Sequence, residues 1–175
     1  MSKALITAGF TVLITAAAAA QSVLPKPTPE HANLGRFVGT WKMEGTMQPG
    51  PMGPGGPFNG TESCRMFEGF HIICDTEGAT AAGPMKGHMM MTWDAAAKKY
   101  RYFAVNNTPI AEMAEGTFEN NIWTWKSEMD LSGGKKIWST FTITETSPTL
   151  HTFEWKMSED GKKWTTMMSG KSTKQ

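Results

Sequence analysis

The sequence has almost no surplus of charge of either sign. Its 175 residues include 17 Lys and Arg against 16 Asp and Glu, which gives a formal net charge of +1. Proteins that bind nucleic acid normally present a basic face, and anionic membrane surfaces attract clusters of Lys and Arg. We therefore expect no nucleic acid as a partner and no electrostatic binding to a membrane surface.

Sequence motifs of catalysis are also missing. The chain contains no Gly-x-Ser-x-Gly elbow, no His-Glu-x-x-His pair and no phosphate-binding loop. Its acidic residues fall mostly at the polar positions of alternating segments, where we expect them to face solvent; they are Glu44, Glu62, Asp75, Glu112, Glu115 and Glu128. We therefore assign no catalytic residue and no enzymatic activity.

Long apolar runs are absent after the first twenty residues. Lys3 supplies one positive charge, and residues 4–20 are uncharged, mostly apolar and end in five alanines. This is the pattern of a secretory signal peptide, so we expect residues 1–20 to be cleaved after Ala20 and the protein to be exported to a periplasm or the extracellular space. A retained membrane anchor is the alternative, but the run of about 17 residues is short for a span. We expect no integral membrane span after cleavage.

Cysteine is scarce, with only Cys64 and Cys74 in the chain. The segments 61–67 and 70–76 read as a hairpin around Glu68-Gly69, and in that register the two cysteines lie directly opposite each other. Because an exported protein meets an oxidising environment, we predict a disulfide between them. The alternative is a pair of buried free thiols.

Helical periodicity is confined to one short segment near the N-terminus. Residues 21–28 form an extended tether, and Thr28-Pro29 is typical of a helix start. From Thr40 onward, apolar and polar residues alternate, with turn residues every 8 to 12 positions. The stretch 49–59 is so rich in Gly and Pro that we expect no regular structure there, either a surface loop or a loop over the mouth of a barrel.

This pattern predicts an all-β domain over residues 29–175. About 8–10 sequential strands with tight turns must pair antiparallel, and a long meander removes its exposed edges by closing on itself. We therefore predict an antiparallel up-and-down β-barrel with a short N-terminal helix. A two-sheet sandwich is the alternative architecture.

Several short motifs resemble a known bacterial family. The segment 34–47, LGRFVGTWKMEGTM, is followed by Gly87, Trp93-Asp94, Lys98-Lys99-Tyr100, Glu115-Gly116-Thr117, the segment 149–155 and Asp160-Gly161-Lys162. In this order and spacing they resemble domain-of-unknown-function family 1579. The resemblance implies a lipocalin-like, calycin-type barrel and no particular activity.

The opening Gly39-Thr40-Trp41 also resembles the start of a lipocalin. There the tryptophan packs across the barrel floor against a basic residue of a late strand. Because no arginine follows Arg101, we expect Lys171 to take that role through a cation–π contact with Trp41.

The apolar strand positions are unusually rich in Met and Trp, which number 14 and 7. Methionine adapts to different shapes, so such a surface suits a binding pocket. We predict a barrel that binds a small apolar or amphipathic molecule. The predicted ligand-binding residues are Met43, Met89, Met91, Trp93, Trp123, Trp125, Phe141, Phe153, Trp155 and Met157.

Two alternatives stay open. One is a haem- or metal-binding barrel, with His71, His88 or His151 as ligand. His151 is the better candidate because it shares a face with Phe153 and Trp155. Copper at His88 and the neighbouring methionines is disfavoured, since alternation turns them to opposite faces. The other alternative is a packed barrel that acts through its outer surface.

Overall fold

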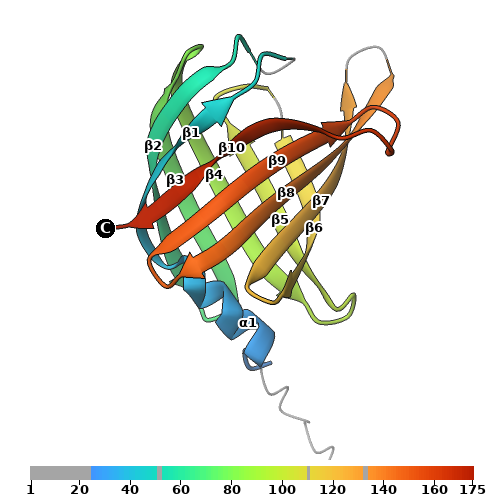
Figure 1. Cartoon of the computed structure of the whole chain (residues 1–175). Helices are drawn as coiled ribbons and strands as arrows, with labels where there is room; N and C mark the ends of the chain where they lie inside the picture. The colour runs from blue at the N-terminus through green and yellow to red at the C-terminus, as the bar shows by residue number, and fades with distance from the viewer. Residues whose placement is uncertain (1–24, 51–52, 110, 132–133) are drawn as a thin grey trace, which may run out of the picture.

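The strands of the chain close into a ten-stranded antiparallel barrel (Figure 1). The computed structural model describes residues 25–50, 53–109, 111–131 and 134–175, so the expected signal peptide at residues 1–20 lies outside the described residues. A short helix α1 (Pro29–Asn33) and a 3-10 turn η1 (Leu34–Phe37) precede the strands. The strands are β1 (Gly39–Met47), β2 (Gly56–Phe67), β3 (His71–Thr80), β4 (Gly83–Asp94), β5 (Lys99–Asn106), β6 (Ala111–Glu119), β7 (Ile122–Leu131), β8 (Lys135–Ser147), β9 (Leu150–Ser158) and β10 (Thr165–Lys174).

Each strand pairs with the next along the chain, and the last pairs with the first. The closing pair runs from Trp41 opposite Lys174 to Met47 opposite Met168. Tight turns join most neighbours, and Asn120 and Asn121 adopt positive φ of 52° and 62° in the turn between β6 and β7. The predicted up-and-down barrel with a short N-terminal helix is thus confirmed, and the sandwich is not formed.

The helical segment closes one end of the barrel (Figure 1). Thr28 occupies the N-cap of α1, and its backbone N–H donates to Nδ1 of His31 (3.0 Å). The following turn buries Leu34 and Phe37, and the Phe37 ring lies 5.0 Å from the ring of Trp123, which is fully buried. We call this apolar layer of Leu34, Phe37, Trp123 and their neighbours the barrel floor.

Trp41 lies in the floor as the sequence predicts, but its basic partner differs. The indole is buried and donates from Nε1 to the backbone oxygen of Phe37 (2.8 Å). The Nζ of Lys174 lies 5.3 Å from its ring centroid, whereas Lys171 forms an ion pair with Glu44 (2.9 Å). The expected contact with Lys171 was therefore wrong. Lys174 shares the inward phase with Trp41 through their direct pairing, and Lys171 faces outward.

The predicted disulfide between Cys64 and Cys74 is confirmed. The two residues are direct partners in the β2–β3 pairing, with Cα atoms 4.1 Å apart, and both are buried. The bridge therefore joins two adjacent strands on the inner face of the barrel.

The Gly- and Pro-rich stretch is partly regular, contrary to expectation. Strand β2 begins at Gly56, so residues 56–59 pair with β1 although they contain Pro57 and Gly56. The pairing places Phe58 on the inner face, where it is buried, and this apolar anchor extends the strand. The connection between β1 and β2 is therefore limited to residues 48–55.

Within the described ranges, no helix is long and apolar enough to span a membrane.

Candidate functional site

A cavity of about 530 Å³ occupies the barrel between the floor and the open end. Side chains from both halves of the meander line it, and most of its wall is apolar. The wall includes Met47, Phe58, Met85, Met89, Ala104, Trp125, Met129, Phe141, Trp155 and Met168. Residues 53–55 of the β1–β2 connection lie at its mouth. This space is within the range of small-molecule sites, which is roughly 300–1,000 Å³.

The ten predicted ligand-binding residues separate into two groups. Met89, Trp125, Phe141 and Trp155 line the cavity. The remaining six do not line it: Met91, Trp93 and Trp123 belong to the core around the floor, Phe153 and Met157 are buried, and Met43 is half-buried on β1. Alternation identifies the inward face, but only the stacking order along the barrel axis decides which inward residues meet the empty space.

Two carboxyl groups expected to face solvent line the cavity instead. Glu62 of β2 accepts a hydrogen bond from the Thr76 hydroxyl (3.2 Å). Glu112 of β6 accepts one from the Ser127 hydroxyl (2.9 Å). The assignment of both to the solvent face was wrong, and for Glu62 the sequence held a signal: it lies two residues from Cys64, which faces inward.

Tyr102 is a further polar group of the cavity, and it was not predicted from the sequence. Its ring lies 5.5 Å from that of Trp125, and its hydroxyl has no hydrogen-bond partner among the described residues. It comes two residues after Tyr100, which is buried on the same inner face. That spacing, in a chain with only two tyrosines, was the available signal.

The three polar groups are held away from their charged forms by their surroundings. Burial raises the pKa of Glu62, against the opposing effect of the Thr76 hydrogen bond. Burial likewise raises the pKa of Glu112, which its two serine partners only partly offset. The pKa of Tyr102 is raised by burial and then by the charges of Glu112 and Glu62. All three groups line the same cavity.

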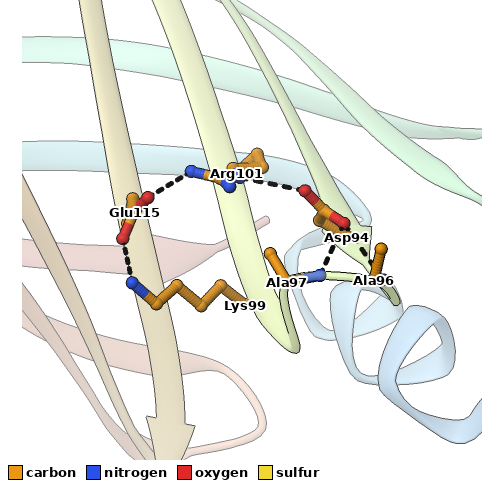
Figure 2. Close-up of polar contacts among 6 residues, drawn as sticks. All are labelled: Asp94, Ala96, Ala97, Lys99, Arg101 and Glu115. Carbon is orange, nitrogen blue, oxygen red and sulfur yellow. Dashed lines mark hydrogen bonds and ion pairs between the residues drawn. The ribbon is translucent and has the colours of Figure 1, made fainter.

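On the outer wall of the barrel, carboxylates form ion pairs with Lys and Arg side chains. Figure 2 shows Glu115 in ion pairs with Lys99 and Arg101, and Arg101 also reaches Asp94 (3.3 Å). Hydrogen bonds from Lys99 and Arg101 lower the pKa of Glu115. The backbone N–H of Ala97 is the largest influence that lowers the pKa of Asp94. In the described part of the chain, no Lys, Arg or His forms such a pair with Glu62 or Glu112.

The histidines do not offer a site for haem. His151 is 4% exposed and stacks on Trp41, with ring centroids 4.2 Å apart. It is packed in the floor and does not line the cavity. Burial lowers its pKa, which favours a neutral ring packed in the floor. His88 lies on the outer wall against Asp75 (2.6 Å), and His71 packs beside Phe67. The residues present therefore do not fit a haem held by a histidine inside the barrel.

A family model described as "Protein of unknown function (DUF1579)" matches residues 26–174. The fold is similar to the crystal structure of Rv2717c from M. tuberculosis, with a TM-score of 0.62 and 10% identity over 86% of this chain and 99% of that one. The structure of EF1p2_mFAP2b bound to DFHBI gives a TM-score of 0.45 and 14% identity, over 83% of this chain and 98% of that one. No curated protein matches the sequence. At these identities the likeness to Rv2717c concerns the fold alone.

Proposed function

Because the chain belongs to the DUF1579 family, whose members are proteins of unknown function, we propose its function from its own cavity: it binds a small apolar or amphipathic molecule inside the barrel. The observation that carries this proposal is the open space of about 530 Å³ above the barrel floor. A barrel of this size can either fill its interior with side chains or enclose a ligand. Here side chains pack the floor and a second, smaller cluster of Ile137, Met157 and Met167, and leave the space of the cavity open.

The wall chemistry supports an adaptable apolar site. Trp125, Phe141 and Trp155 offer aromatic faces, and Met85 and Met89 offer flexible thioether side chains. Aromatic rings bury large areas per residue, and methionine accommodates ligands of different shape. The proposed ligand is therefore a molecule with an apolar body, and the proposal includes no catalytic step.

Export is part of the same proposal. The expected signal peptide at residues 1–20 directs the chain out of the cytoplasm, and the Cys64–Cys74 disulfide is of a kind that persists in oxidising compartments. A carrier or sensor of a small apolar molecule in the periplasm or outside the cell fits both features.

The proposal is tested with N-phenyl-1-naphthylamine, a neutral apolar dye that fluoresces when it leaves water. Titration of the folded protein should give saturable fluorescence with one dye per chain. An Ala104→Phe variant, which fills the cavity wall, should lose this signal. The matched Met113→Phe variant should keep it, because Met113 is 69% exposed on the outer wall.

Two results would overturn the proposal. Absence of saturable dye binding would mean that the cavity does not take an apolar guest. Loss of binding in Met113→Phe with retention in Ala104→Phe would move the site to a second hollow of about 1000 Å³, which Met113 lines.

A further inference from the structure

The cavity holds two carboxyl groups that form no ion pair within the described part of the chain, since Lys86 and His88 at its wall pair with Glu77 and Asp75 instead. Glu62 and Glu112 come from strands far apart around the barrel, yet both line the same apolar space. Among the described residues their hydrogen-bond partners are hydroxyl groups: Thr76 for Glu62, and Ser127 with Ser139 for Glu112. A hydroxyl donor satisfies one lone pair of a carboxylate, but it supplies no positive charge.

An ionised carboxylate without a cationic partner is energetically unfavourable in an apolar cavity. An ionised carboxylate in an apolar enclosure without a cation loses much of its hydration, so an apolar residue would serve a packed interior better. On the outer wall, by contrast, carboxylates form ion pairs with basic side chains, as Glu115 does with Lys99 (Figure 2). The lack of a partner inside the cavity therefore points to a partner that arrives with the ligand.

An independent feature of the cavity agrees. Tyr102 is half-buried and lines the same cavity, and its hydroxyl forms no hydrogen bond with a described residue. This hydroxyl is therefore available to a ligand in the cavity.

We propose that the ligand is a lipophilic amine, whose ammonium group binds at the carboxyls of Glu62 and Glu112 that line the cavity and whose apolar body lies against the aromatic and methionine wall. This inference rests on the proposed function and names its ligand class. An ammonium group carries several N–H donors for carboxylate oxygens. The aromatic faces of Trp125 and Trp155 in the same cavity add favourable contacts for a cation.

The charge of the cavity disfavours two other head groups, a carboxylate and a hydroxyl. A carboxylate head would bring a third negative charge beside two carboxyls and is repelled. A hydroxyl head forms neutral hydrogen bonds, which are weaker than the charge-assisted bonds of an ammonium. The order of affinity should therefore be amine, then alcohol, then carboxylate.

The pH dependence follows from the state of the carboxyls. Burial raises the pKa of Glu62 and of Glu112, so acidification neutralises them before an exposed glutamate would titrate. An alkylamine stays protonated across this range, since its pKa resembles that of lysine. Affinity for the amine should therefore fall as the pH drops from 8 toward 4.5, while affinity for an uncharged ligand of the same length stays constant.

The experiment measures displacement of N-phenyl-1-naphthylamine by decylamine, 1-decanol and decanoate at pH 8, each below its micellar concentration. For the wild-type protein, decylamine should bind at least ~10-fold more tightly than 1-decanol, as expected for charge-assisted hydrogen bonds, and decanoate most weakly. The double variant Glu62→Gln/Glu112→Gln should lose this preference and keep its affinity for 1-decanol. The control Glu44→Gln/Glu115→Gln, which removes two outer carboxylates, should behave as wild type.

The outcomes separate the two proposals. Equal affinity for the amine and the alcohol, tighter binding of decanoate, or an amine preference that survives in Glu62→Gln/Glu112→Gln would overturn the lipophilic amine and leave the apolar cavity standing. Failure of the dye and of all three ligands to bind would overturn both.

Discussion

Gly87 is the position at which a single side chain should close the cavity. It lies on the inner face of β4 and lines the open space. A Cβ atom added there would have its nearest neighbours at 3.5 Å, the backbone oxygen of Val105, and at 3.8 Å, the Cβ of Thr76. These are ordinary van der Waals contacts, so Gly87→Phe introduces a ring into the cavity without moving the backbone.

The expected effect on stability is a gain. Full burial of a phenylalanine side chain contributes roughly 1.5–3 kcal/mol, and a ring in an open cavity realises about half of this. Removal of a glycine from a strand interior adds about 0.5–1 kcal/mol. Gly87→Phe should therefore stabilise the folded protein by about 1.3–2.5 kcal/mol and weaken dye binding by about 100-fold or more, since the ring occupies the site.

The assay combines urea denaturation with the dye titration, and Met90→Phe is the matched control. Met90 lies on the same strand, on the outer wall, and is 40% exposed. Its replacement should leave dye binding unchanged. If Gly87→Phe keeps wild-type dye affinity, or unfolds at lower urea than wild type, then the interior at Gly87 is not the open ligand site described here.

Three further predictions concern the floor, the disulfide and a buried carboxyl. Trp41→Ala should lower the free energy of unfolding in urea by ~3–5 kcal/mol, because it empties the floor, and a loss near zero would refute the packing. Cys64→Ala/Cys74→Ala should cost about 2–3 kcal/mol, as expected for a bridge between residues 10 apart, and an unchanged urea midpoint would contradict this. Burial raises the pKa of Glu62 above its unfolded value near 4.5, so the folded state is favoured below that pH and loses stability as the pH rises through the folded pKa. Glu62→Gln should remove this loss, so the variant should gain on wild type from pH 4 to pH 8, whereas parallel stability curves would show that Glu62 is not buried.

Much of the barrel could be predicted because its local signals agree with its long-range pairing. The alternation from Thr40 onward predicted a meander, and the symmetric placement of Cys64 and Cys74 about Gly69 predicted the register of β2 and β3. Trp41 could be assigned to the interior because Gly39-Thr40-Trp41, directly after the short helical segment, resembles the start of a lipocalin. These features depend on residues close in sequence.

The site was less predictable because, at one end of β6, a charged side chain faces the barrel interior and an apolar one faces solvent. Glu112 faces inward while Met113 is 69% exposed, so hydrophobicity gives the wrong phase at this end of the strand. The true phase is fixed by Gly116: a Cβ there would lie 2.4 Å from the ring of Trp125, so only glycine lets the tryptophan pack on this strand. That constraint comes from β7 and is visible only once the strands are paired.

The most direct test of the central claim is a native mass spectrum of the protein, expressed from the full sequence, purified without detergent and recorded with 1-decanol added. Ligand binding in the cavity predicts a one-to-one complex for the wild-type chain and for Met90→Phe, and a bare chain for Gly87→Phe. A bare wild-type chain, or a complex that persists in Gly87→Phe, would contradict a ligand site inside the barrel.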